Sequence, residues 1–142
     1  MEMPTPNRPT TSVSAFRVVP VSRVYPDSAR AVFDAATYAV TDEGIGLALV
    51  DQEQQFLESN WVDVSALRHV PPASTETVQG GDRMVRFQFR TERTGGGTRL
   101  VGEALVRPTG GGRYADQMAP ASHPAREVLA RMFEHVTERL GK

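Results

Sequence analysis

The chain contains no cysteine, and this absence excludes several classes of protein at once. Disulfide-stapled folds, cysteine zinc sites, iron–sulfur clusters and thiol nucleophiles all require that residue. Lysine is nearly absent as well, because Lys142 is the only lysine among 16 basic residues. The net charge of -1 provides no overall field that would attract nucleic acid or an acidic membrane. We therefore expect no nucleic-acid partner.

Long apolar runs are also missing. No stretch reaches the roughly 18 apolar residues that a membrane-spanning helix needs, so we expect no transmembrane segment. Residues 1–12 lack the apolar region of a signal peptide and carry Pro4, Pro6 and Pro9. Prolines so spaced favour an extended arm. This arm is either a disordered tail or a segment that lies along a partner, and its three prolines are candidate partner contacts.

The composition that remains is that of one folded domain. The chain has 142 residues, of which 39% are apolar and 23% charged. A chain of about this length buries roughly 68–70% of its unfolded surface and needs no staple. We expect a single domain over residues 13–142, preceded by the arm of residues 1–12.

Two segments have the apolar spacing of amphipathic helices. Residues 29–40 place alanine, valine and phenylalanine on one helical face, after a capping Asp27 or Ser28 and before Gly44. Residues 124–140 do the same, with Ser122 as the predicted cap, Pro124 in the first turn and Gly141 at the end.

The strands follow from alternation and from breaker residues. Residues 13–25 read as an edge strand because Pro20 removes one donor. Residues 45–50 and 56–67 form a predicted hairpin, as do residues 83–93 and 99–107 around a glycine-rich turn, while residues 69–82 read as a loop. The element order β-α-β-β-β-β-α predicts an α+β fold, with an antiparallel sheet of about five strands and both amphipathic helices on one face.

No catalytic or metal-binding motif is recognisable. The glycine-rich stretches at residues 95–97 and 110–115 lack the residues and the following helix that phosphate-binding motifs require. The spacing of His69, His123 and His135 matches no metal site. His123 and Glu127 lie across the start of the last helix, but two weak ligands do not make a closed site, and we expect His123 to lie on the loop surface. We expect no catalytic residue, no metal, no cofactor and no enzymatic activity.

The uncovered face of the sheet holds the strongest candidate contacts. Alternation in residues 83–93 puts Arg86 and Arg90 on the face opposite Phe87, beside Arg99 and Arg107 of the next strand. Trp61 leans to the same side if Val62 faces the core. Such a face is either a solvated mixed-charge surface or a protein contact, since tryptophan and arginine are favoured contact residues. We select Trp61, Arg86 and Arg90 as candidate contacts.

The order of features between Val24 and Val64 resembles small bacterial envelope lipoprotein domains of the BamC-like helix-grip type. A strand leads to a helix containing V-F-D-A-A, then to a strand led by Gly44, and a hairpin returns through Trp61. The later R-F-Q-F-R strand, glycine-rich turn, strand and closing helix keep that order. The chain departs from the pattern in lacking a lipobox cysteine and a glycine in the turn at residues 51–55. The resemblance implies a non-enzymatic envelope accessory domain and assigns no functional residue.

The prediction from these features is an accessory or structural subunit. It binds other protein subunits of a larger, membrane-associated assembly through its open sheet face and its arm. The resemblance implies a periplasmic or membrane-peripheral location, and without it we expect a cytoplasmic one. The alternative is a small-ligand binder with a helix-grip cavity, because the small residues Gly102 and Ala104 leave room between sheet and helix.

Overall fold

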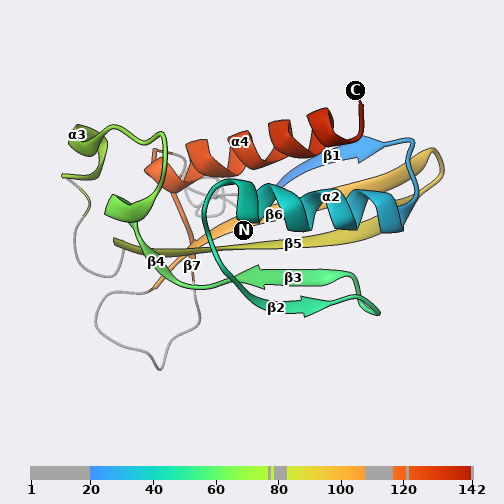
Figure 1. Cartoon of the computed structure of the whole chain (residues 1–142), viewed down its shortest axis with the longest axis horizontal. Helices are drawn as coiled ribbons and strands as arrows, with labels where there is room; N and C mark the ends of the chain where they lie inside the picture. The colour runs from blue at the N-terminus through green and yellow to red at the C-terminus, as the bar shows by residue number, and fades with distance from the viewer. Residues whose placement is uncertain (1–19, 77, 79–82, 108–116, 121, 142) are drawn as a thin grey trace, which may run out of the picture.

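A computed structural model describes residues 20–76, 78, 83–107, 117–120 and 122–141, in which one antiparallel sheet lies against two long helices (Figure 1). The strands lie in the order β1-β6-β5-β3-β2. Their bounds are Val21–Tyr25 for β1, Gly97–Val106 for β6, Met84–Thr94 for β5, Phe56–Ser59 for β3 and Leu47–Asp51 for β2. Two shorter strands, β4 (Val62–Asp63) and β7 (Gln117–Met118), pair with β5 and β6. The predicted α+β class and element order are confirmed, and β1 lies at an edge of the sheet.

Helix α2 (Ala29–Asp42) begins at a side-chain cap and ends at a glycine. The Ser28 hydroxyl accepts a hydrogen bond from the Ala31 N–H at 3.2 Å, which satisfies one of the free donors of the first turn. Gly44 follows the helix with a φ of 79°, the left-handed conformation that glycine adopts without strain. The sequence thus located both ends of α2 and left only the choice between Asp27 and Ser28 open.

Helix α4 (Pro124–Arg139) has a different cap from the one predicted. His123, not Ser122, is the capping residue, and its Nδ1 accepts the Ala125 N–H at 3.0 Å. Pro124 occupies the first turn, so the residue immediately before it takes the cap position. His123 is only 7% exposed, and the prediction that it lies on the loop surface is wrong. Gly141 ends the helix with a φ of 78°.

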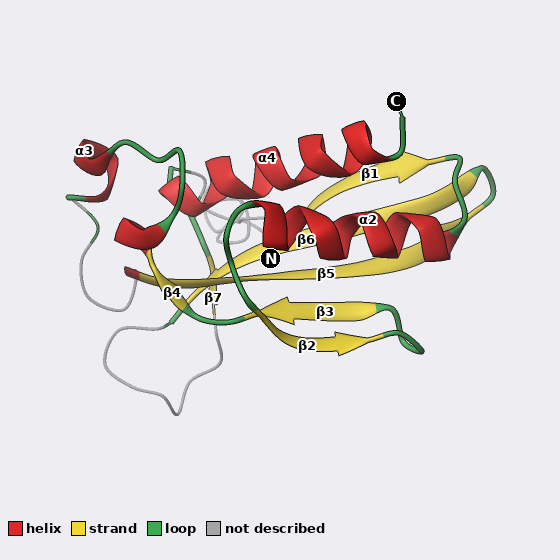
Figure 2. Ribbon diagram, viewed as in Figure 1, coloured by secondary structure: helices red, strands yellow, loops and turns green. Residues whose placement is uncertain are grey.

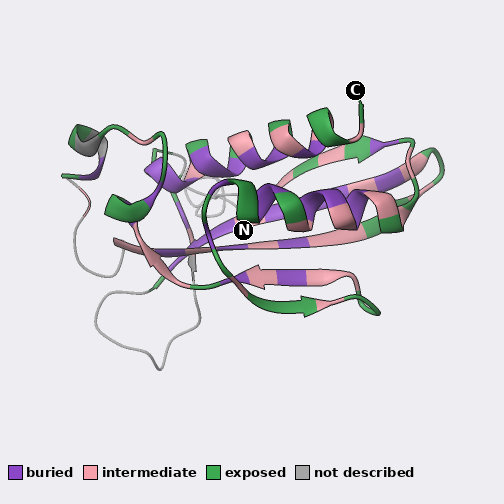
Figure 3. Ribbon diagram, in the orientation of Figure 1, coloured by how far each residue is buried: buried purple, intermediate pink, exposed green. Residues whose placement is uncertain are grey.

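The hairpin of β5 and β6 fixes which side chains face the helices. Thr94 pairs with Gly97, so Gly95 and Gly96 form a two-residue turn, and the register continues to Val85 opposite Val106. Phe87 and Phe89 are buried towards the helices, whereas the intervening residues are half-buried on the other side. Figure 3 shows this alternation along the strands. Both long helices lie on the Phe87 side of the sheet (Figure 2).

Helix α4 approaches β6 closely at Gly102. A Cβ at that position would lie 2.7 Å from Cε1 of Phe89 and 2.9 Å from Cε2 of Phe133. The Phe89 and Phe133 rings themselves pack with their centroids 5.5 Å apart. The absence of a side chain at Gly102 therefore lets two core aromatic rings meet over the sheet.

Two predicted segments are divided more finely in the structure. The strand predicted over residues 56–67 ends at Ser59, resumes as β4, and then turns through a single 3-10 turn at Val64–Ala66. Ser59 is buried, and its hydroxyl accepts the Phe87 N–H of the neighbouring strand at 2.9 Å. The predicted loop of residues 69–82 contains a one-turn helix, α3 (Pro72–Thr75). Strand β2 also has an irregularity between Leu47 and Leu49, where its register with β3 shifts.

Candidate functional site

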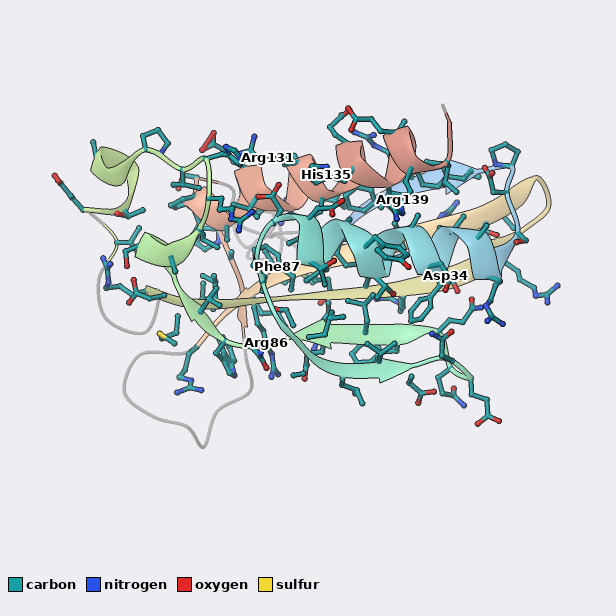
Figure 4. All side chains as sticks on the ribbon, viewed as in Figure 1. Asp34, Arg86, Phe87, Arg131, His135 and Arg139 are labelled. Carbon is teal, nitrogen blue, oxygen red and sulfur yellow. The ribbon has the colours of Figure 1, made fainter. Side chains whose placement is uncertain are left out.

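The two long helices cover only one surface of the central strands, and we call the other surface the open face. On β6 this face is not bare, because its Val101 and Leu105 are only 5% and 6% exposed. Arg86 and Phe87, labelled in Figure 4, are successive residues of β5 and therefore belong to opposite surfaces of the sheet. The strand register assigns the rest of the open face. Its members are Ser22 and Val24 on β1, Arg99, Val101, Glu103 and Leu105 on β6, Arg86, Gln88, Arg90 and Glu92 on β5, and Phe56 and Glu58 on β3. We also count Trp61, which contacts Arg86, and Arg107, which contacts Trp61.

At one end of the open face, two arginines lie over a single tryptophan. Trp61 precedes β4, and its ring centroid is 4.6 Å from Cζ of Arg86 and 4.8 Å from Cζ of Arg107. Such cation–π contacts contribute about 0.5–1 kcal/mol each at exposed sites. We call Trp61, Arg86 and Arg107 the Trp61 cluster. Because two guanidinium groups already occupy its ring, Trp61 is not a bare platform for stacking a base.

The central arginines of the open face are tied to glutamates. Nη2 of Arg86 lies 3.2 Å from Oε2 of Glu58, and Glu58 also accepts a hydrogen bond from Gln88. Nη1 of Arg90 lies 3.2 Å from Oε2 of Glu103, and Nη2 of Arg90 lies 3.3 Å from Oε2 of Glu92. These pairs hold the side chains flat on the sheet and neutralise most of its positive charge.

The remaining positive charge is not evenly spread along the face. Around Arg90, two arginines (Arg90 and Arg99) lie with two glutamates (Glu92 and Glu103). In the Trp61 cluster, Arg86 pairs with Glu58. Arg107 is exposed and makes no ion pair with any residue of the described ranges. Within the Trp61 cluster, Arg107 is therefore the cation without an acidic partner among the described residues.

Beside the Trp61 cluster, an arginine fixes the loop that follows β4. Oδ1 of Asp63 accepts hydrogen bonds from the Ser65 N–H at 2.9 Å and from Nη2 of Arg83 at 2.8 Å. The hydrogen bond from the Ser65 N–H, followed in size by the one from Arg83, holds the pKa of Asp63 below its ordinary value. Nη1 of Arg83 also donates to the carbonyls of Thr75 and Val78, each at 3.0 Å. Arg83 thus joins the segment that follows Trp61 to the α3 segment.

Sequence reasoning placed Trp61, Arg86 and Arg90 on one surface, and all three lie on the open face. The structure brings Trp61 and Arg86 into contact. Arg90 lies four residues further along β5, about 13 Å away at the rise of a strand, and pairs with glutamates instead. Pro4, Pro6 and Pro9, the candidate contacts of the arm, lie outside the described residues.

A buried ionic cluster between α2 and α4 escaped the sequence reasoning. Glu43, which ends α2, has a side chain only 1% exposed; its Oε2 lies 2.8 Å from Nε2 of His135 and 3.3 Å from Nε of Arg131. His135 and Arg131, labelled in Figure 4, are one helical turn apart on α4 and so reach the same carboxylate. The only sequence signal was this four-residue spacing of basic residues, because Glu43 is 92 residues away from His135 in the chain.

The histidines do not assemble a metal or catalytic centre within the described part of the chain. His123 is occupied as a helix cap, His69 is exposed in a left-handed conformation, and His135 contacts the carboxylate of Glu43, which also pairs with Arg131. The described residues contain no group of three or more histidine, aspartate or glutamate side chains that could hold a metal ion.

Two surface depressions lined by described residues lie away from the open face. One, of about 320 Å³, is lined by residues of the α2 start and the β5–β6 turn, including Ser28, Arg93 and Thr98. Another, of about 290 Å³, lies next to it at Glu53, Gln55 and Arg93. Between α4 and the sheet, where a helix-grip cavity would lie, Phe89 and Phe133 fill the space beside Gly102. Gly102 therefore offers no room for a ligand.

Comparisons with known proteins assign the chain to no class. No family model matches it, and no curated protein matches it. None of the described helices is long and apolar enough to span a membrane.

Proposed function

We propose that this chain is a non-enzymatic accessory subunit that binds a larger protein assembly through its open face. One observation carries the proposal. The central strands of the sheet lack a helical cover on one side, and on that side a tryptophan is held by two arginines. Tryptophan and arginine are the residues most often responsible for binding energy at protein interfaces.

The charge pattern favours a protein over a nucleic acid as the partner. A phosphate backbone needs a track of available cations, whereas Arg86 and Arg90 are already paired with Glu58 and Glu103. The glutamates on the same strands would repel successive phosphates. A protein partner can match alternating charges with its own.

Two further parts of the proposal rest on the sequence alone. The resemblance to envelope lipoprotein domains of the BamC-like helix-grip type suggests that the assembly is membrane-associated. The three prolines of residues 1–12 suggest that the arm adds a second contact. Cell fractionation of the full chain and of a chain lacking residues 1–12 tests both parts. We expect recovery with membranes for the full chain and weaker recovery for the shortened one.

The main test places a photo-crosslinking amino acid on each side of the molecule. Ser22 suits the open face because it is exposed and pairs across the sheet with Val101. Glu138, exposed on α4, provides the matched position on the helical side. We expect one protein, identified by mass spectrometry, to be captured from Ser22 and not from Glu138. Equal capture from both positions, or none from Ser22, would refute the proposed use of the open face.

A further inference from the structure

The open face has one cation whose surroundings prepare it for an external anion. Arg107 follows the last residue of β6, and its backbone N–H donates to the Met84 carbonyl at 3.3 Å. This bond continues the ladder of the sheet and fixes where the side chain starts. The guanidinium then lies over Trp61, 4.8 Å from the ring centroid. Both ends of the Arg107 side chain are therefore positioned before any partner arrives.

A guanidinium stacked on an aromatic ring keeps its hydrogen-bonding edge available. The cation–π contact uses the face of the planar group, whereas the N–H donors lie in its plane. The donors of Arg86, the other arginine over Trp61, reach Glu58 at 3.2 Å. Arg107 makes no such ion pair with a described residue, so its in-plane donors remain for another group. Two parallel N–H donors match the two oxygens of a carboxylate.

We propose that Arg107 binds a carboxylate of the partner protein, and that this contact orients the partner on the open face. The proposal rests on the proposed function, since the carboxylate belongs to the subunit that the open face binds. The partner segment at this position is acidic, presenting an aspartate, a glutamate or a chain terminus.

The charges of the open face favour a single carboxylate over a polyanion. From Arg107 and Arg86 towards the centre of the face, the uncharged Leu105 and Gln88 come next. The first carboxylates beyond them are Glu103 on β6 and Glu58 on β3. An anionic group over Arg107 therefore meets one uncompensated cation and then a carboxylate. A single acidic side chain fits this pattern, while a nucleic-acid strand would extend into the repulsive part.

The first arm of the test needs no partner. Isotope-labelled full-length protein is titrated with sodium acetate, and with sodium chloride and acetamide as matched controls for ionic strength and shape. Trp61 is the only tryptophan, so its indole N–H gives a single NMR signal that reports on the cluster. We expect acetate to shift the indole and Arg107 Nε–H signals more than either control does. Arg107→Gln should abolish the indole shift, and Arg99→Gln should leave it.

The second arm uses the partner captured from Ser22. We expect Arg107→Gln to weaken capture about tenfold, equivalent to about 1.4 kcal/mol. Arg107→Lys should weaken it less, because lysine keeps the positive charge but lacks the two parallel N–H donors. Arg99 is the matched control, since it lies on the same face and makes no cation–π contact with a described aromatic ring. Arg107→Glu should lose binding, and changing one acidic residue of the partner to arginine should restore it. Thermal melting confirms that each variant is folded.

The possible results separate the two proposals. If Ser22 captures no protein while acetate still shifts the cluster, the carboxylate site stands and the proposed function fails. If a protein is captured but Arg99→Gln and Arg107→Gln weaken it equally, the proposed function stands and the role of Arg107 is overturned. If a short oligothymidylate shifts the indole at lower concentration than acetate, with more than one arginine responding, the site binds phosphate backbones and the proposal is wrong.

Discussion

The buried carboxylate of Glu43 allows a quantitative test of how α2 and α4 are held together. Glu43→Gln keeps the size of the side chain and one acceptor oxygen, so it leaves no cavity and removes only the charge. A hydrogen bond to a charged group contributes about 1.5–3 kcal/mol. Arg131 and His135 have side chains 34% and 28% exposed, so water partly compensates them after the change. We therefore expect a loss near the lower end, about 2 kcal/mol in the free energy of unfolding.

Urea unfolding followed by circular dichroism measures this loss directly. The expected change lowers the midpoint and leaves the slope unchanged, because the surface exposed on unfolding stays the same. For a chain of this length, about 2 kcal/mol corresponds to a fall of about 7 °C in Tm. Glu138→Gln, an exposed change on α4, serves as the control and should stay within about 0.5 kcal/mol of the parent.

A double-mutant cycle assigns the effect to the pair itself. Glu43→Gln and His135→Gln should together cost less than the sum of the single changes, by about 1 kcal/mol. Additive costs would show that the 2.8 Å contact between Glu43 and His135 contributes no coupling. A Glu43→Gln variant as stable as the parent would refute the reasoning as a whole.

Three other substitutions test the packing, the loop and the cap. Gly102→Ala places a Cβ 2.7 Å from the Phe89 ring and should cost about 1–3 kcal/mol in urea unfolding. Arg83→Gln should destabilise the fold by about 1–2 kcal/mol at pH 7, because it removes hydrogen bonds to Asp63 and to two carbonyls. The pKa of Asp63 is depressed in the fold, so its contribution is present above the unfolded pKa of about 3.9 and is lost as the pH falls through the folded value. The Arg83→Gln deficit should accordingly narrow at pH 3. Ser28→Ala should cost about 1 kcal/mol through loss of the α2 cap, again by urea unfolding.

Each of these predictions has an outcome that would contradict it. Gly96→Ala is the matched control for Gly102→Ala, because no atom lies within 4 Å of the added carbon. If both variants lost the same free energy of unfolding, the close contact at Gly102 would not be the cause. An Arg83→Gln deficit that grows at low pH would show that Asp63 is not its relevant partner. A Ser28→Ala variant with unchanged stability would mean that Asp27 or water replaces the cap.

The sequence predicted the parts of the fold that are set by local periodicity. The apolar stripes of α2 and α4 and the alternation in β5 each depend on spacing within one segment, so their buried faces were predictable. The cap of α4 was predicted one residue early, because serine is a commoner capping residue than histidine and Pro124 was placed in the first turn without fixing its exact position. Local propensity gave no reason to prefer an imidazole nitrogen.

The contacts of the candidate site depend on register and on distant pairing. That Arg86 and Trp61 share a surface followed from alternation. That Arg107 reaches the same ring follows from the pairing of Thr94 with Gly97, which sets every later pair of the hairpin. The pairing of Arg90 with Glu103 has the same origin. The contact between Glu43 and His135 joins two helices that pack side by side but are far apart in the sequence, and no spacing within either helix encodes it.

The pairing of β1 with β6 constrains how this chain folds as it is synthesised. Val21, near the start of the described chain, lies opposite Gly102, and the core over that edge is completed only by α4. Strands β2, β3 and β5 therefore leave the ribosome before β6, which joins β1 to the sheet, and before α4, which packs over it. Contacts between segments so distant form late and slow folding. Until residues 124–139 have emerged, a nascent chain of this protein exposes the part of the apolar side of its sheet that α4 covers, and this interval is when it most needs a chaperone.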